Sequence, residues 1–348
     1  MNLLLLLLGF ALLAKHFEDT RVPRALPRIL PDDWKGCFVL LVIVFVLSSF
    51  LDNIAAALIG GAIAHTVFRA KVHIGYLAAI VAASNAGGAG SVIGDTTTTM
   101  MWIAGIGPLE VVEAAIGAVV ALVIFGIPAS LQQQRYAPIQ RHADVGVVID
   151  WARVGVVGFI LIAAVAVNIT INARFKQVAD LFPFLGAAVW VALLITAVVR
   201  RPEWALLPNA LKGSLFLISL VLAASMMPVD QLPLASWQTA LGLGFLSSVF
   251  DNIPLTALAI RQSGYDWGFL AYAVGFGGSM VWFGSSAGVA LSSMFPEARS
   301  VGRWVRHGWP VAVAYVVGFL VMLAFIGWQP GSTPRSSAPA VTEQDKQR

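Results

Sequence analysis

Long apolar runs dominate this chain, and five of them have the length needed to cross a lipid bilayer. They cover residues 111–131, 154–173, 181–199, 209–227 and 309–328. About 20 apolar residues in a helix span the hydrocarbon core of a membrane. The pattern therefore predicts an all-α polytopic membrane protein.

Shorter apolar runs are arranged in pairs around two similar dipeptides, Asp52-Asn53 and Asp251-Asn252. The flanking runs are residues 36–51, 54–68, 238–250 and 253–260. A single run of this length does not span, so each pair is either one kinked helix or a re-entrant hairpin. Basic residues both precede and follow the first pair, which places its two ends on the cytoplasmic side. We therefore predict hairpins with an Asp-Asn pair at each tip.

Two further runs, residues 76–107 and 267–295, are too long for one simple helix. Glycine-rich stretches interrupt them at residues 85–91 and 275–279, which predicts broken helices. Each half of the chain thus reads as hairpin, broken helix and closing helix. Following the basic residues along the chain gives the halves opposite orientations, so we predict an inverted repeat.

This repeat divides the chain into alternating scaffold and transport segments. Before its hairpin, the first half holds only the short run of residues 3–14, so we expect it to lack about two N-terminal helices. We predict a remnant scaffold helix and interfacial connector in 1–35, the first hairpin and broken helix in 36–107, scaffold helices and a connector in 108–236, the second hairpin and broken helix in 237–295, a last scaffold helix in 296–329 and a disordered tail in 330–348.

Composition supports the membrane prediction and excludes other classes. Hydrophobic residues make up 58% of the chain and charged residues 11%, and the mean hydropathy is +0.82, far from the composition of a soluble domain. The net charge of +4 comes from residues between the apolar runs, so a nucleic-acid partner is not expected. The single Cys37 provides neither a disulfide framework nor a transition-metal cluster. We expect no cofactor.

The hairpin tips and helix breaks carry the polar residues that could perform chemistry. A carboxylate at the bilayer centre costs roughly 2.5 to 3.5 kcal/mol, so such residues are usually functional. We predict an ion-binding and proton-binding site formed by Asp52, Asn53, Asn85, Asp95, Thr97, Thr98, Ser247, Asp251, Asn252, Ser279, Ser285 and Ser286. Structural glycines are expected at the breaks, namely Gly87, Gly88, Gly277 and Gly278.

The two halves align with different offsets at the tips and at the breaks. Asp52 and Asp251 are 251 − 52 = 199 positions apart, whereas Gly87 and Gly277 are 277 − 87 = 190 apart. With the second offset Asp95 corresponds to Ser285, so the site holds three carboxylates rather than four. Oxygen ligands suit a hard cation, and a carboxylate that binds either the cation or a proton provides exchange by competition.

Simpler interpretations exist for each of these residues. Asp95 could only cap the half-helix that follows it, and Asp52-Asn53 could only form a turn. The serine and threonine hydroxyls could bond the backbone of their own helices.

The stretch from Asn85 to Trp102, with its Gly94-Asp95 and four threonines, resembles the signature of NhaD-type sodium/proton antiporters. This family belongs to the ion transporter superfamily, which includes citrate, dicarboxylate and arsenite carriers. Both Asp-Asn-Ile tips, Gly277-Gly278-Ser279 and Gly284-Ser285 are also similar. The sequence departs from the family pattern at residues 55–57, 90 and 92.

The resemblance implies a dimerising scaffold domain, a transport domain with two hairpins, and elevator-type alternating access. It also implies exchange of sodium or lithium for protons. The functional positions of the family would fall on Asp52, Asn53, Asn85, Asp95, Thr97, Thr98, Ser247, Asp251 and Asn252.

We therefore expect a transporter rather than an enzyme, located in a bacterial inner membrane and exchanging sodium or lithium for protons. Asp52, Asp95 and Asp251 are the expected titrating groups. The alternatives are a carrier of a small anion such as citrate, a dicarboxylate or arsenite, and a truncated membrane protein that transports nothing. An intramembrane aspartyl protease is disfavoured because Val92-Ile93-Gly94-Asp95 lacks the Gly-x-Gly-Asp pattern.

Overall fold

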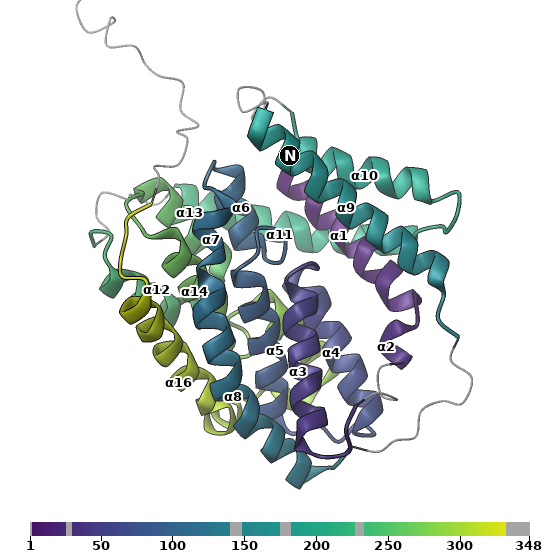
Figure 1. The fold of residues 1–348 in the computed structure, drawn as a ribbon, viewed down its shortest axis with the longest axis vertical. Helices are drawn as coiled ribbons and strands as arrows, with labels where there is room; N and C mark the ends of the chain where they lie inside the picture. Colours follow the sequence, from purple (N-terminus) through teal and green to yellow (C-terminus); the bar gives the residue numbers. More distant parts are fainter. Residues whose placement is uncertain (1, 26–29, 140–147, 175–181, 227–232, 332–348) are drawn as a thin grey trace, which may run out of the picture.

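The structure is a computed structural model, which describes residues 2–25, 30–139, 148–174, 182–226 and 233–331 (Figure 1). All regular elements in these ranges are helices. Among them, two continuous helical segments, Pro108–Tyr136 and Val301–Phe325, are long and apolar enough to cross a membrane by length and composition. Shorter apolar helices accompany them. An all-helical fold of this composition is typical of a polytopic membrane protein.

The helices begin and end close to the predicted boundaries. The first half contains α3 (Trp34–Ser48), α4 (Asn53–Val67), α5 (Ile74–Ala89), α6 (Thr96–Ile103), α7 (Pro108–Val112) and α8 (Ala114–Tyr136). The second half contains α12 (Trp237–Ser247), α13 (Asn252–Gln262), α14 (Trp267–Gly277), η4 (Gly278–Met280), α15 (Ser286–Met294), η5 (Pro296–Arg299) and α16 (Val301–Phe325). The remaining elements are α1 (Asn2–Asp19), α2 (Val22–Ala25), α9 (Trp151–Arg174), α10 (Phe184–Thr196), η2 (Trp204–Leu206) and α11 (Leu207–Ser225).

The glycine-rich stretches are mostly helical, which corrects the predicted position of the breaks. Helix α5 continues through Gly87 and Gly88 to Ala89, and α14 continues to Gly277. A Cβ on Gly87 would overlap the carbonyl oxygen of Phe45, and one on Gly277 would overlap that of Gly244. Gly87 therefore allows α3 to approach α5 closely, and Gly277 allows α12 to approach α14 closely. The breaks in α5 and α14 come only after these glycines.

Helix α1 is longer than predicted and extends into the expected connector. Lys15 forms ion pairs with Glu18 at 2.9 Å and Asp19 at 3.3 Å, spacings that support another helical turn. The connector predicted at the end of 108–236 lies partly outside the described residues, which omit 227–232. The predicted tail also lies outside them from residue 332 onward.

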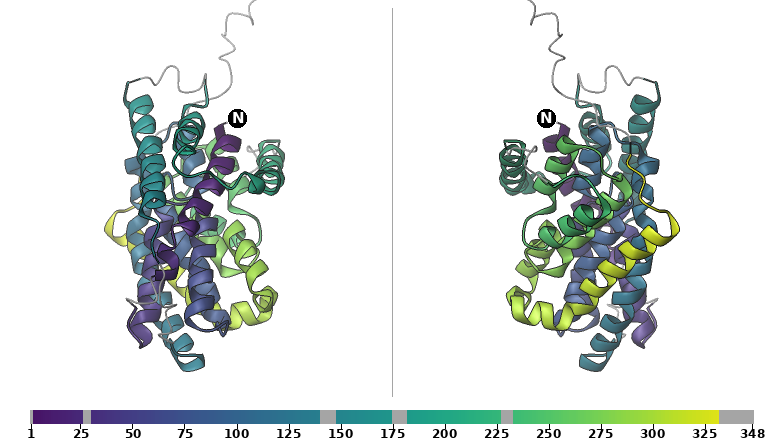
Figure 2. Two further views of the ribbon diagram at one scale, coloured as in Figure 1. Left: turned by 90° about the vertical axis from the view of Figure 1, so that its right-hand side faces the viewer. Right: turned by 90° about the vertical axis from the view of Figure 1, so that its left-hand side faces the viewer.

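The helices pack into two groups. Helix α1 contacts α9, α10 and α11, and α9 contacts α10, at one end of the molecule, while α5 and α14 lie at the centre of the second group (Figures 1 and 2). Helix α11 also packs against α13 of the second hairpin. Helices α8 and α16, which the sequence predicts to be scaffold helices, pack against each other and against α5 and α14. Helices α8 and α16 cross closely at Gly117 and Gly318, where a Cβ added to Gly117 would lie only 3.1 Å from the Gly318 carbonyl oxygen. This packing assigns α8 and α16 to the group that carries the hairpins.

Candidate ion-binding site

Both tip aspartates lie at the start of the second helix of their hairpin. One oxygen of Asp52 accepts a hydrogen bond from the Ile54 N–H at 3.3 Å, and one oxygen of Asp251 accepts from the Ile253 N–H at 3.1 Å. These are N-cap contacts, which satisfy otherwise free N–H groups of α4 and α13. Each aspartate therefore fixes a tip and keeps a second oxygen for another partner.

Each hairpin is also attached to the neighbouring broken helix through a buried serine. The Ser48 hydroxyl donates to the Ser84 carbonyl oxygen, and the Ser247 hydroxyl donates to the Val274 carbonyl oxygen at 2.7 Å. The serines differ by 247 − 48 = 199 positions and their acceptors by 274 − 84 = 190. These are the two offsets found in the sequence, so the same contact occurs in both halves.

Asp95 is 1% exposed and lies directly before α6. One carboxylate oxygen accepts from the Asn53 side-chain amide at 3.1 Å, and the other accepts from the Thr97 hydroxyl at 2.5 Å. A capping role alone accounts for neither bond. The first tip and α6 together therefore hold this carboxylate by side-chain donors.

Asn85 connects the two halves of the molecule. Its carbonyl oxygen accepts from the Asn53 amide at 3.1 Å. Its own amide nitrogen donates to the hydroxyl oxygens of Ser279 at 2.9 Å and Ser285 at 3.0 Å. All these side chains are buried. A continuous polar network thus extends from Asp95 through Asn53 and Asn85 to the second helix break.

The other predicted residues lie in different surroundings. The Asp251 carboxylate accepts from the Ser286 hydroxyl at 3.2 Å, and Asn252 is buried at the start of α13. The Thr98 hydroxyl donates to the backbone oxygens of Ser91 and Asp95, so it serves local structure. Asp52 lines a small cavity beside α1, together with Leu6, Leu7, Phe10, Ile93, Thr96 and Thr99.

Two contributors were missed by the reasoning from sequence. The Ser49 hydroxyl donates to the Gly87 carbonyl oxygen at 3.0 Å, and the Ser49 carbonyl oxygen accepts from the Ser91 hydroxyl at 2.7 Å. Gly275 lies beside the Asp95 carboxylate, where a Cβ would be 3.1 Å from the oxygen that accepts from Thr97. The offset of 190 positions, which relates Gly275 to Asn85, is the signal that could have pointed to it.

The three carboxylates Asp52, Asp95 and Asp251 have no basic partner among the described residues. The ion pairs among the described residues lie away from these carboxylates, at the ends of α1, α9 and α10. A buried carboxylate without a counter-charge is costly unless it binds a cation or a proton. These three carboxylates are therefore chemically suited to bind a cation or a proton.

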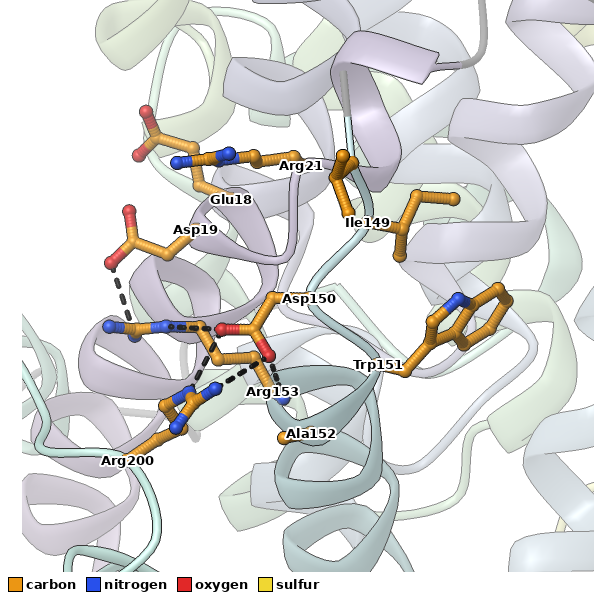
Figure 3. Close-up of a pocket in the computed structure, with 10 residues that line it drawn as sticks. Glu18, Asp19, Arg21, Ile149, Asp150, Trp151, Ala152, Arg153 and Arg200 are labelled. Carbon is orange, nitrogen blue, oxygen red and sulfur yellow. Dashed lines mark hydrogen bonds and ion pairs between the residues drawn. The ribbon is translucent and has the colours of Figure 1, made fainter. Parts of the chain in front are cut away.

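A second polar pocket shows the opposite electrostatic arrangement (Figure 3). Arg200 Nε lies 2.9 Å from Asp150, and Arg153 lies 3.2 Å from Asp19. The Arg200 hydrogen bond and charge lower the pKa of the Asp150 carboxyl. Acidic and basic side chains balance in this lining, which includes Glu18, Asp19, Arg21, Asp150, Arg153 and Arg200. The ion pairs of this pocket connect the ends of α1, α9 and α10, so the carboxylates of Asp19 and Asp150 are compensated by arginine side chains.

Residues 1–262 match the family model described as citrate transporter. The chain belongs to this family. Its membership supports a multi-pass membrane transporter, and the many apolar helices agree with it.

Individual relatives carry the names of antiporters. The chain is 27% identical to sodium/proton antiporter 1 of Arabidopsis thaliana over 88% of its length and 57% of that protein. It is 26% identical to the Na(+)/H(+) antiporter NhaD of Halomonas elongata over 81% of its length and 66% of that protein. The corresponding values for NhaD of Vibrio cholerae are 28%, 80% and 68%. The chain thus spans between about half and two thirds of these relatives, and the resemblance to NhaD-type antiporters is confirmed.

Proposed function

We propose that this protein exchanges sodium ions for protons across a membrane, with Asp95 at the centre of the cation site. The buried Asp95 carboxylate carries the proposal, because its partners are neutral donors and no basic side chain of the described ranges pairs with it. Relatives named sodium/proton antiporters support the choice of ions. Asp52 and Asp251 are the further titrating groups, and lithium is expected to replace sodium.

Competition between a cation and a proton explains how one site can perform exchange. A sodium ion would be held by carboxylate, amide and hydroxyl oxygens, which are suitable ligands for a hard cation. Protonation of Asp95 removes the negative charge and releases the ion. We assign Asn53, Asn85, Thr97, Ser279 and Ser285 to this site, and Ser247, Asn252 and Ser286 to the second hairpin around Asp251. Thr98 is assigned a local structural role.

The packing in two groups supports an elevator-type movement. In this proposal α1, α9, α10 and α11 form the scaffold, and the hairpins and broken helices move together with α8 and α16. The repeated contacts at offsets of 199 and 190 positions support an inverted repeat with re-entrant hairpins. Apolar side chains of α9 and α10 are exposed, including Ile162, Leu194 and Ile195. We propose that they face lipid and a second copy in a bacterial inner membrane.

The second candidate is a carrier of a small anion, which the description of the family model favours. The carboxylates of Asp52, Asp95 and Asp251 would repel an anion such as citrate, a dicarboxylate or arsenite. The charge of the site therefore favours the cation.

Proton movement in vesicles tests the proposal directly. Purified protein is reconstituted, and proton release is measured after adding sodium, lithium, potassium or citrate. We expect responses to sodium and lithium that fall to background in Asp95→Asn, because the amide cannot exchange a proton for a cation. Asp150→Asn is the matched control and should keep the response. Undiminished sodium exchange in Asp95→Asn would contradict the mechanism, and a response to citrate alone would favour the anion carrier.

A further inference from the structure

Helices α5 and α14 cross at the centre of the site, and their contacts repeat at the offset of 190 positions. Asn85 corresponds to Gly275, because 275 − 85 = 190. Its two hydrogen-bond partners Ser279 and Ser285 correspond in the same way to Ala89 and Asp95. The contact of Asn85 with the second break therefore has a counterpart in the contact of Gly275 with the first break.

The two equivalent positions at this crossing carry different side chains, an asparagine amide at Asn85 and none at Gly275. On one side the Asn85 amide nitrogen lies between two hydroxyl oxygens, at 2.9 and 3.0 Å. On the other side Gly275 provides no side chain. A Cβ at that position would lie 3.1 Å from the Asp95 oxygen and 3.4 Å from the Ala89 Cβ. At Gly275, α14 thus places no side-chain atom between its backbone and the Asp95 carboxylate.

We propose that Gly275 sets the size of the cation-binding space at Asp95, while Asn85 fills the corresponding space in the other half with its own amide. This inference rests on the proposed cation exchange. Selectivity between hard cations depends on the size of the cavity and on the number and flexibility of its oxygen ligands. A methyl group at position 275 either narrows the space or moves the carboxylate by a few tenths of an ångström. Both effects disfavour sodium more than the smaller lithium ion.

Substitution of Gly275 by alanine tests this specificity role. Proton release from vesicles is measured against sodium and lithium concentration in Gly275→Ala. We expect the apparent KM for sodium to rise about tenfold and that for lithium to rise less than about threefold, because small misplacements of a ligand are costly. The matched control is Gly242→Ala in α12, where an added Cβ meets nothing within 4 Å. It should leave the ratio of the two KM values unchanged.

A change on the opposite helix gives an independent test. Ala89→Gly enlarges the same space, so we expect it to shift the KM ratio toward larger ions, with measurable exchange of potassium. Combining it with Gly275→Ala should restore the ratio of the unmodified protein. If Gly275→Ala does not fold, Ala89→Gly alone decides the question.

An unchanged KM ratio in both single variants would overturn the role of Gly275, as would an equal change in Gly242→Ala. These outcomes are separate from failure of the proposed function. Loss of exchange in Asp95→Asn, together with unchanged ratios in the glycine variants, would leave the antiporter proposal intact and reject only the inference about size.

Discussion

Individual hydroxyl and amide groups fix the hairpin tips to the helix breaks. Sequence reasoning identified which residue types would meet, and the structure joins Asn53, Asn85 and Asp95 as expected. It did not identify what each hydroxyl bonds. The Thr97 hydroxyl donates to a carboxylate, whereas the hydroxyl of the next residue, Thr98, donates to backbone oxygens. Neighbouring threonines are identical in sequence, and only the direction of each side chain separates their roles.

Ser48 and Ser247 offer a residue-scale prediction. Each is buried, and removing its hydroxyl leaves a buried carbonyl oxygen without this donor, which costs about 1 to 3 kcal/mol. We expect Ser48→Ala and Ser247→Ala to lower the melting temperature in detergent by similar amounts. The control is Ser219→Ala, whose hydroxyl donates to Leu215 within its own helix. A loss in only one of the two variants would show that the contacts are not equivalent.

At the scale of the elements, hydrogen bonds and ion pairs at the helix ends connect α9 to its neighbours. The beginning of α9 is joined to α1 by the hydrogen bond from the Asp150 N–H to the Thr20 carbonyl oxygen at 3.0 Å. It is joined to the end of α10 by Arg200. Apolar length predicted α9 and α10, but it could not predict that Asp150 connects them (Figure 3).

The lowered pKa of Asp150 gives a prediction of pH dependence. Since its pKa in the folded state lies below the unfolded value of about 3.9, its contribution to stability is complete above that value. The contribution is lost as the pH falls through the folded pKa. We therefore expect the melting temperature to exceed that of Asp150→Asn at pH 7, and the difference to shrink below about pH 3.9. A difference that grows on acidification would contradict this assignment.

The described helices form two groups, which meet where α11 packs against α13 and where α1 lies beside the first tip. Phe10 of α1 and Ile93 of the first break line the same small cavity as Asp52. If the groups move relative to each other, this contact must change during transport. Exchange should therefore depend on the freedom of α1 to separate from the break.

Cross-linking tests this movement. Phe10→Cys and Ile93→Cys are introduced together with Cys37→Ala, and a bifunctional thiol reagent joins the two groups. We expect sodium-driven proton release to stop after cross-linking and to return after a cleavable linker is reduced. Asp150→Cys with Arg200→Cys provides a control link within the scaffold group and should leave exchange active. Full activity of the Phe10–Ile93 cross-linked protein would exclude the elevator movement.

The sequence by itself determined the apolar helices, the Asp-Asn tips and the residue types at the breaks, because hydrophobicity and turn preferences act over short stretches of chain. It also determined the offsets of 199 and 190 positions. Only the tertiary structure decided that α8 and α16 pack with the hairpins and that Asn85 reaches Ser279 and Ser285, 194 and 200 positions away. It alone placed Gly275 against Asp95. Such contacts depend on how closely helices can approach in three dimensions, which local patterns do not specify.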